Sequence, residues 1–457
     1  MAHVFPTMLC CGRRSVWTTM SLPSETPSSR VRSRMIGLVM AICFISHLNR
    51  ASMSVAGTDR IMGEYSLTPV QMGWVYSSFL LVYSICMIPG GVFIDRQGPR
   101  RALMVVGFGS AALGASTGLL GWAGFGAAFF LTSLILVRGV MGLLSAPLHP
   151  AGARVVGNWF PAGQRSWANG IVTAAAIAGV ASSYTLFGSL IGTVGWPAGF
   201  VICGAATALL ASLWTAMSAD RPEQHPGVHP TELSWIQGSD CARGQAEGRG
   251  DAGWLQLLRS RNLLLVTMSY AAVGYFQYLF VYWMQYYFDR VLQLGDVTSK
   301  YYAGLLQVAL AIGMPLGGWL SIVLSRRWGV GKGRALVAGC GMTLSAGFLA
   351  LGVVSSQPFY IVLWFALAHA ALGASEGPIW ATAVDTGGRF GGTAAAICNT
   401  GGNLGGLLAP VLTPWISGWA GWGWGIGVGG LICLLGACCW FGVRLEPRVE
   451  VRQGERS

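Results

Sequence analysis

Twelve stretches of mostly apolar residues follow one another along this chain of 457 residues. Each is close to the roughly 20 residues that a helix needs to cross the hydrocarbon core of a bilayer. A soluble protein could not cover its surface with this composition, since only 10% of the residues are charged and 53% are hydrophobic. The expected membrane spans lie near residues 36–57, 69–92, 102–120, 124–147, 165–192, 196–217, 262–288, 300–322, 334–354, 358–384, 392–416 and 423–443.

One long polar segment divides the expected spans into two groups of six. A weak internal repeat supports this division, because Gly90-Gly91 and Gly317-Gly318 each precede a basic loop after the second span of a half. The sequence therefore predicts an all-α membrane protein with two six-helix halves, an architecture of transporters that bind their substrate near the midplane. The expected parts are a disordered N-terminal cytoplasmic tail (1–34), an N-terminal bundle (35–217), a cytoplasmic linker (218–261), a C-terminal bundle (262–443) and a cytoplasmic C-terminal tail (444–457).

Lys and Arg are distributed unevenly between the two sides of the expected membrane. If both termini are cytoplasmic, 24 of the 29 basic residues lie on the cytoplasmic side, and only Arg60, Arg290 and Lys300 lie outside. This bias orients membrane proteins, and it explains the net charge of +12 without a nucleic-acid partner. We expect a monomer in the cell membrane. An organellar membrane is the alternative if residues 1–34 are a presequence, but we favour a disordered tail or a true start at Met20 or Met35.

Two arginines, Arg50 and Arg138, lie inside apolar spans. A charge at the centre of a membrane costs at least ~2.5–3.5 kcal/mol, so it normally faces a protein interior or a wet cavity. The acids in or near the spans are Asp95, Glu376 and Asp385, and only Glu376 lies deep. A cavity that stays positive attracts anions, and a guanidinium can bind a carboxylate through two hydrogen bonds. The arginines therefore predict binding of a small organic anion.

Other polar and aromatic residues recur at helical spacing inside the spans. In chain order these pairs are His47 and Arg50, Tyr278 and Tyr282, Glu376 and Trp380, and Asn399 and Asn403. Aromatic rings suit the C–H faces of a polyol and amides suit its hydroxyls, so we expect these residues to line the pocket of a sugar acid. The eleven cysteines form no CxxC pair or Cys/His cluster, and there is no nucleophile–base pair or phosphate loop. We therefore expect no cofactor, no metal and no enzymatic activity.

The segment Gly91-Val92-Phe93-Ile94-Asp95-Arg96-Gln97-Gly98-Pro99-Arg100-Arg101 resembles the signature between spans 2 and 3 of the major facilitator superfamily. The resemblance implies the major facilitator fold, in which two halves rock and spans 1, 4, 7 and 10 line a central cavity. It also implies that Asp95, Arg96 and Arg100 gate the cytoplasmic side. Ile322 occupies the equivalent of the Asp in the second half, so we expect such a latch on one side only.

The segment Asn49-Arg50-Ala51-Ser52-Met53-Ser54-Val55-Ala56 is similar to the span 1 motif of the anion:cation symporter family. That family includes bacterial galactonate, glucarate and hexuronate transporters. Further similar segments are Arg138 with Ala146-Pro147, Tyr278 to Trp283, Asn399 to Gly406, and Arg221 to Val228. The resemblance implies that Arg50 binds the substrate carboxylate. It also implies that Tyr83, Trp380 and Asn399 or Asn403 contact the rest of the molecule.

The chain departs from that family at two acids that carry coupling protons, which are replaced here by Asn49 and Ser145. Glu376 is the deep carboxylate left for coupling. We hypothesise that it pairs with an arginine in the empty protein and is protonated when substrate displaces it; the alternative is that it stabilises a helix broken at Gly377-Pro378. His47 and His149 are further candidates for a proton path.

The sequence thus predicts a secondary active transporter of a small organic anion, working by alternating access and coupled to protons or sodium. An uncoupled uniporter or anion exchanger of the same fold is one alternative, because both coupling acids are missing. A ligand sensor that keeps the transporter fold without transporting is the other.

Overall fold

The computed structural model describes residues 30–160, 165–233, 254–387 and 391–443. The C-terminal tail, most of the N-terminal tail and the candidate starts Met1 and Met20 therefore lie outside the described residues. All regular secondary structure within these ranges is helical. Eleven helical segments there are long and apolar enough to cross a membrane. The remaining expected span, near residues 392–416, is α14 (Gly391–Ala420), which is not among these eleven.

The N-terminal half contains the first six spans, and four of them are built differently from simple helices. Span 1 continues from α1 through a π-helical turn, spans 2 and 3 are one interrupted helix, and span 5 contains another π-helical turn. The helices are α1 (Arg30–Ala56), α2 (Met62–Glu64), α3 (Pro69–Trp122), α4 (Ala127–Ser145), α5 (Leu148–Trp159), α6 (Arg165–Ser182), α7 (Gly188–Val194) and α8 (Trp196–Met217), with π-helical turns η1 (Gly57–Ile61) and η3 (Ser183–Phe187).

The C-terminal half contains the other six spans, and each is built mainly on one long helix. Short 3₁₀ turns, η4 (Pro222–Gln224) and η5 (Trp254–Arg259), lie in the polar segment between the halves. The helices are α10 (Arg261–Tyr286), α11 (Asp296–Trp328), α12 (Val330–Val354), α13 (Pro358–Gly387), α14 and α15 (Trp422–Cys438), with a π-helical turn η6 (Tyr287–Val291) after α10 and a 3₁₀ turn η8 (Cys439–Phe441) after α15.

The interruption of α3 lies at Gly98, whose φ of 81° is in the region that favours glycine. A Cβ at Gly98 would overlap the carboxylate of Asp220, just beyond the end of α8. That carboxylate accepts a hydrogen bond from the backbone N–H of Arg100 at 2.8 Å. The turn between spans 2 and 3 is therefore fixed to the end of span 6.

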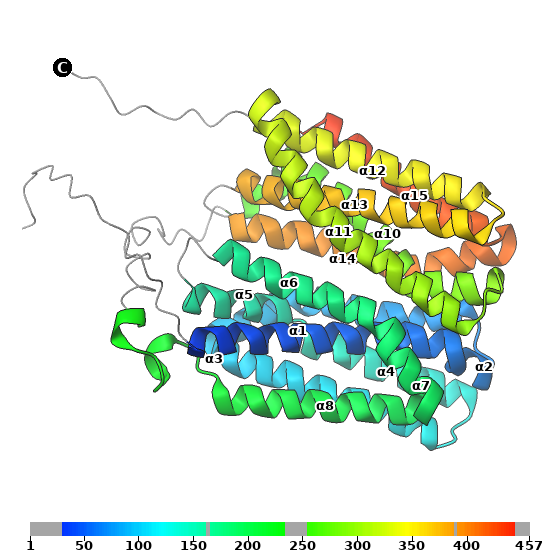
Figure 1. The fold of residues 1–457 in the computed structure, drawn as a ribbon, viewed down its shortest axis with the longest axis horizontal. Coiled ribbons are helices and arrows are strands. Elements are labelled where there is room, and N and C mark those ends of the chain that lie inside the picture. The colour runs from blue at the N-terminus through cyan, green and yellow to red at the C-terminus, as the bar shows by residue number, and fades with distance from the viewer. Residues whose placement is uncertain (1–29, 161–164, 234–253, 388–390, 444–457) are drawn as a thin grey trace, which may run out of the picture.

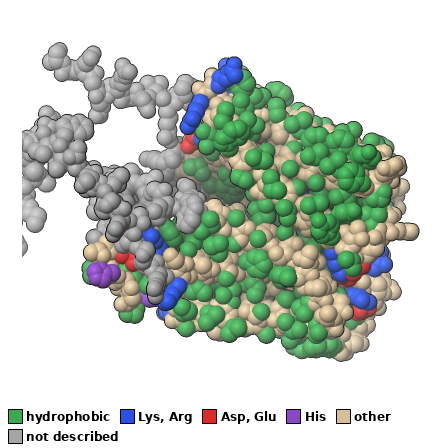
Figure 2. Space-filling view, in the orientation of Figure 1, with side chains coloured by type: hydrophobic (Ala, Val, Ile, Leu, Met, Phe, Trp, Pro, Cys, Tyr) green, Lys and Arg blue, Asp and Glu red, His purple; other side chains and the backbone are tan. Residues whose placement is uncertain are grey.

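The two halves lie side by side and meet more closely at one end than at the other (Figure 1). We call the end where α1 begins and α8 ends the Arg30 end, and the end where α11 begins the Asp296 end. Figure 2 shows a hollow between the halves at the Arg30 end. The hydrophobic contacts agree, because Tyr282 and Trp283 of the C-terminal half belong to a core cluster of the N-terminal half. A separate cluster at the Arg30 end contains N-terminal residues only.

Candidate functional site

Arg50 lies on α1 between the two halves and is partly exposed. Its Nη2 donates a hydrogen bond to the hydroxyl of Tyr278 on α10, so it reaches across to the C-terminal half. The guanidinium carbon is 4.7 Å from the ring centroid of Phe79, 5.6 Å from that of Tyr83 and 4.9 Å from that of Tyr278. The faces of these rings attract a cation. Among the described residues, no carboxylate forms an ion pair with Arg50.

Arg138 lies on α4 and is 1% exposed. Its Nη2 donates to the backbone oxygen of Arg50 at 3.1 Å, and its Nη1 lies 3.3 Å from the sulfur of Met141. Its Nε has no hydrogen-bond partner within the described part of the chain. The guanidinium carbon is 5.2 Å from the ring centroid of Phe79, which therefore contacts both arginines.

Close packing of α4 on α3 brings Arg138 to this position. Any side chain at Gly142, one turn after Arg138, would overlap the backbone oxygen of Phe79. Glycine at a helix interface allows backbones to approach in this way. The consequence is a buried cluster of two guanidinium groups. It is stabilised by ring faces, a hydroxyl and a carbonyl oxygen but, in the ranges that the structure describes, by no negative charge.

The amides of α14 lie next to this cluster. The hydroxyl of Tyr278 lies 3.4 Å from Oδ1 of Asn403, and Nδ2 of Asn403 donates to the backbone oxygen of Asn399 at 3.0 Å. Both asparagine side chains approach the sulfur of Met87 on α3, at 3.9 Å from Asn399 and 3.6 Å from Asn403. Tyr278 and both asparagines are thus brought together across the interface between the halves.

The tyrosines expected in the site come from both halves, and both Tyr83 and Tyr282 interact with the arginines. Tyr83 is close to Arg50 and its ring stacks on that of Phe79 at 5.8 Å. Tyr282 lies one turn beyond Tyr278, towards the Asp296 end, and its ring stacks on that of Tyr76 at 4.4 Å. Tyr282 therefore contributes to the contact between the halves on the Asp296 side of the arginines.

Glu376 is buried on α13 and has neutral partners. Gln277 donates to Oε1 at 2.7 Å and the indole N–H of Trp380 lies 3.1 Å from Oε2. The same indole lies 3.2 Å from the hydroxyl of Tyr270. The expected ion pair between Glu376 and a deep arginine is therefore wrong for this conformation, because neutral donors on α10 and α13 occupy the carboxylate. We did not predict Gln277, although its position next to Tyr278 in an apolar span was the available signal.

His47 on α1 and His149 on α5 contact each other on the Arg30 side of Arg50. Their Nε2 atoms are 3.3 Å apart, and their ring centroids are 5.0 Å apart in an edge-on arrangement. Asn49, in contrast, points away from the interface and donates to Thr207 of α8 at 2.8 Å. Of the polar residues around Arg50 on span 1, His47 lies towards the centre and Asn49 contributes to packing within the N-terminal half.

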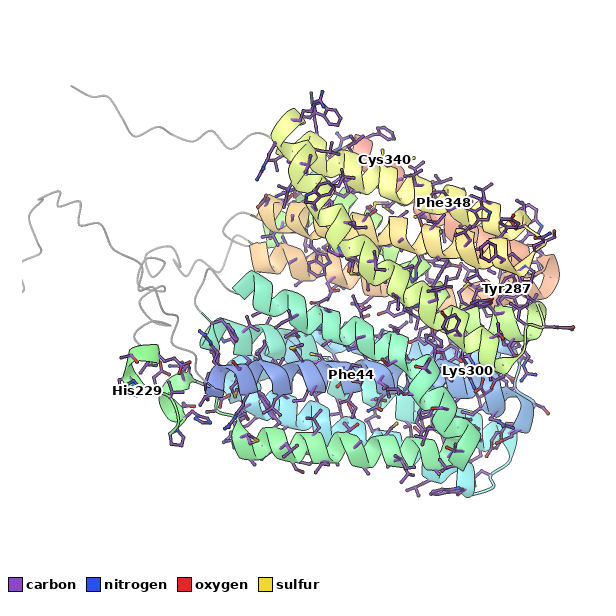
Figure 3. All side chains as sticks on the ribbon, in the orientation of Figure 1. Phe44, His229, Tyr287, Lys300, Cys340 and Phe348 are labelled. Atoms are coloured by element: carbon purple, nitrogen blue, oxygen red, sulfur yellow. The ribbon has the colours of Figure 1, made fainter. Side chains whose placement is uncertain are left out.

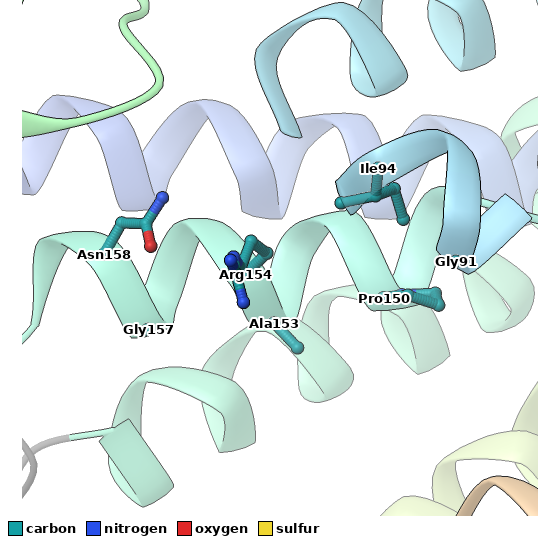
Figure 4. A pocket seen from close by; sticks show the side chains of 7 residues that line it. All are labelled: Gly91, Ile94, Pro150, Ala153, Arg154, Gly157 and Asn158. Carbon is teal, nitrogen blue, oxygen red and sulfur yellow. The ribbon is translucent and has the colours of Figure 1, made fainter. Parts of the chain in front are cut away.

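The expected gating residues lie at the Arg30 end. The side chain of Arg100 donates to the backbone oxygen of Thr215 at 2.6 Å, while Arg96 is exposed. The side chain of Asp95 lies outside the described residues. Between α3 and α5 is a pocket of about 410 Å³ lined by Gly91, Ile94, Pro150, Ala153, Arg154, Gly157 and Asn158 (Figure 4).

A second buried ionic cluster lies at the Asp296 end, and the sequence analysis did not predict it. Nζ of Lys300 lies 2.5 Å from Asp59 and 2.7 Å from Asp296 (Figure 3 labels Lys300). Gln285 also donates to Asp59, at 2.7 Å. One expectation was therefore wrong: Asp59 belongs with the buried acids, because η1 continues α1. Lys300, expected on the outer side, is buried at the Asp296 end.

Comparisons with known proteins agree with this architecture. A family model described as Major Facilitator Superfamily matches residues 39–391. The chain is 27% identical over 414 residues to a probable galactarate/D-glucarate transporter of Bacillus subtilis, covering 86% of this chain and 88% of that protein. It is 27% identical over 384 residues to a probable sulfoacetate transporter of Cupriavidus necator, covering 84% and 86%.

Among solved structures, the fold is similar to that of a bacterial homologue of the human lysosomal transporter Spinster in an inward-facing and unoccupied conformation. The TM-score is 0.73 at 16% identity, and the match covers 91% of this chain and 97% of that one. At this identity the similarity concerns the fold alone, and it confirms the prediction of two six-helix halves.

Proposed function

Because this chain belongs to the Major Facilitator Superfamily, we propose that it transports a small organic anion, with sugar acids as the first substrate class to test. Membership of this family makes the chain a membrane transporter and not an enzyme. The observation that carries the proposal is the cluster of Arg50 and Arg138, which lacks a carboxylate partner among the described residues. An anion entering this cluster would supply the missing negative charge.

The neighbouring residues suit an anion that also carries hydroxyl groups. Arg50 can anchor a carboxylate, and Arg138 strengthens the positive field behind it. The amides of Asn399 and Asn403 can donate to and accept from hydroxyls, while Tyr83 offers a ring face. The relatives named for galactarate, glucarate and sulfoacetate transport also favour small organic anions.

We infer an alternating-access cycle from the difference between the two ends of the molecule. The halves are separated by a hollow at the Arg30 end and joined by Lys300 and Asp59 at the Asp296 end (Figure 2). Rocking of the halves would open the second end and close the first, exposing Arg50 to each side in turn. The excess of basic residues favours placing the Arg30 end in the cytoplasm, in the cell membrane.

We propose Glu376 as the residue that takes up a coupling proton. Its carboxylate is buried and has no cationic partner among the described residues, so a proton would remove an uncompensated charge. Glu376→Gln keeps the shape and should remove the pH dependence of net uptake while sparing exchange of substrate for substrate. Uptake in proteoliposomes across a pH gradient measures this. If Glu376→Gln kept the pH response of the unmodified protein, the coupling role would be lost and an uncoupled uniporter or exchanger would be favoured.

The substrate assignment is tested first by binding. Purified protein would be screened by thermal unfolding against aldonates, aldarates, hexuronates, sulfonates and neutral sugars, and the anions that raise the unfolding temperature would be used for uptake. We expect Arg50→Ala to lower uptake about 100-fold or more, since a hydrogen-bonded ion pair is worth about 3 kcal/mol. Arg326→Ala removes one exposed arginine and is the matched control.

Two results would contradict this function. One is stabilisation by neutral sugars or cations but by none of the anions. The other is an Arg50→Ala protein that inserts normally and transports the anion at the rate of the control. Binding without any flux would instead favour a ligand sensor.

A further inference from the structure

A pair of histidines, His47 on α1 and His149 on α5, lies directly beside Arg50. The two residues are 102 positions apart in the chain, and their Nε2 atoms are 3.3 Å apart. His47 precedes Arg50 by three residues, so both lie on the same face of α1. Within the described residues, no carboxylate forms an ion pair with either histidine.

The hydrogen bonds define where the pair holds its protons. Nδ1 of His47 lies 2.9 Å from the backbone oxygen of Cys43, which can only accept, so this nitrogen carries the hydrogen. Nε2 of a neutral His47 must then accept, and Nε2–H of His149 is the donor at 3.3 Å. Nδ1 of His149 is left as the basic nitrogen of the pair. An additional proton would therefore bind at Nδ1 of His149, and the His149 imidazolium would keep its hydrogen bond to His47.

The pair has access from the Arg30 end. Both histidines are only partly buried. The residue after His149, Pro150, lines the pocket of about 410 Å³ between α3 and α5 (Figure 4). That pocket lies on the side where the halves are separated by the hollow. A proton can therefore reach the pair from the same side as a substrate moving to Arg50.

The charges around the pair couple a proton to an anion. Arg50 on α1 acts electrostatically on both histidines, and Cys43 contacts His47 only through its backbone oxygen. The ionisable groups around Arg50 are Arg138 on α4, Tyr83 on α3 and Tyr278 on α10. Near neutral pH the charged groups among these are the two arginines. A protonated pair adds a third positive charge to those of Arg50 and Arg138, which is unfavourable in the empty site. A carboxylate bound to Arg50 offsets part of this positive charge, so the anion and the proton each increase the affinity for the other.

We propose that the His47–His149 pair takes up a proton when an organic anion binds at Arg50. It is a second proton site, on the N-terminal half, in addition to Glu376 on the C-terminal half. This inference rests on the proposed transport of an anion. A proton taken up together with the anion would reduce the net negative charge that is moved. The pair could provide this coupling although no acid contacts Arg50 within the ranges that the structure describes.

The test measures proton uptake on binding directly. The full chain in detergent would be titrated calorimetrically with the anion identified in the binding screen, in buffers of different ionisation enthalpy between pH 5 and 8. The dependence of the heat on the buffer gives the number of protons bound per anion. We expect net uptake by the unmodified protein, with anion affinity increasing as the pH falls. His149→Gln keeps an amide donor but removes the basic nitrogen, so uptake should fall by half or more and the pH dependence of affinity should flatten.

Further variants separate the possible outcomes. His47→Gln should reproduce the effect of His149→Gln, and it serves as the second test if one of the two variants does not fold. His229→Gln changes an exposed histidine and should leave uptake unchanged. Proton uptake in His149→Gln equal to that of the His229→Gln control would overturn the role of the pair. Failure of Arg50→Ala to weaken anion binding would instead overturn the transport proposal itself.

Discussion

Two buried clusters of positive charge lie at different depths in this molecule and have different kinds of partner. Lys300, at the Asp296 end, has two carboxylates, from Asp59 and Asp296. Arg50 and Arg138, midway between the ends, have ring faces, a tyrosine hydroxyl and a backbone oxygen. Both clusters lie at the interface between the halves. Only the arginine cluster keeps an unneutralised positive charge among the described residues.

The difference indicates different roles. A buried cation with carboxylate partners is already neutralised, so it contributes to the contact between the halves and has little attraction for a ligand. A buried cation held only by dipoles and ring faces keeps most of its field and can attract an anion. The comparison therefore assigns Lys300 to closure of the Asp296 end and the arginines to substrate. Removing Lys300 should therefore mainly lower the stability of the protein, whereas removing an arginine should mainly lower its affinity for the anion.

The largest effect on stability should follow removal of Lys300. Lys300→Met leaves the buried carboxylate of Asp59, whose side chain is 4% exposed, without its partner. Breaking one side of a buried ion pair costs about 3–5 kcal/mol. The double variant Asp59→Asn with Lys300→Met removes both charges and should recover most of that loss. Thermal unfolding in detergent measures both, and equal unfolding temperatures for the single and double variants would contradict the assignment.

The next effect should be on anion affinity, after removal of Arg138. Arg138→Met leaves no buried carboxylate without a partner among the described residues, so its unfolding temperature should fall less than that of Lys300→Met. Coulomb's law gives about 2 kcal/mol for a charge ~8 Å from the anion at an effective dielectric constant of ~20, so affinity should fall about tenfold to thirtyfold. Titration with the transported anion measures this. A stability loss as large as that of Lys300→Met with unchanged affinity would show that both clusters are structural.

The smallest effect should come from the partner of Arg50. Tyr278→Phe keeps the ring under the guanidinium but removes the hydroxyl that accepts from Arg50 and lies 3.4 Å from Asn403. A single hydrogen bond contributes about 0.5–1.5 kcal/mol, so affinity should change by a factor of about two to ten. The direction is informative. A loss means that the hydroxyl contacts the substrate, whereas a gain means that it competes with the substrate for Arg50.

Local sequence properties determined the spans, the two halves and the presence of the deep arginines. Apolar length alone predicted the membrane helices, because the energy of placing a helix in lipid depends on its own residues. The rarity of charge in those spans made Arg50 and Arg138 conspicuous. The same reasoning missed Asp59 as a buried acid, because the end of the first apolar stretch did not show that the helix continues through η1.

The tertiary structure alone decided which of these groups have partners. His47 meets His149 across 102 residues, Gln277 reaches Glu376 across 99, and Arg50 reaches Tyr278 across 228. Such contacts depend on how helices from distant parts of the chain pack, and hydropathy carries no information about that packing. The sequence therefore determined that positive charge is buried in this protein, while the fold decided where that charge is neutralised and where it remains available to an anion.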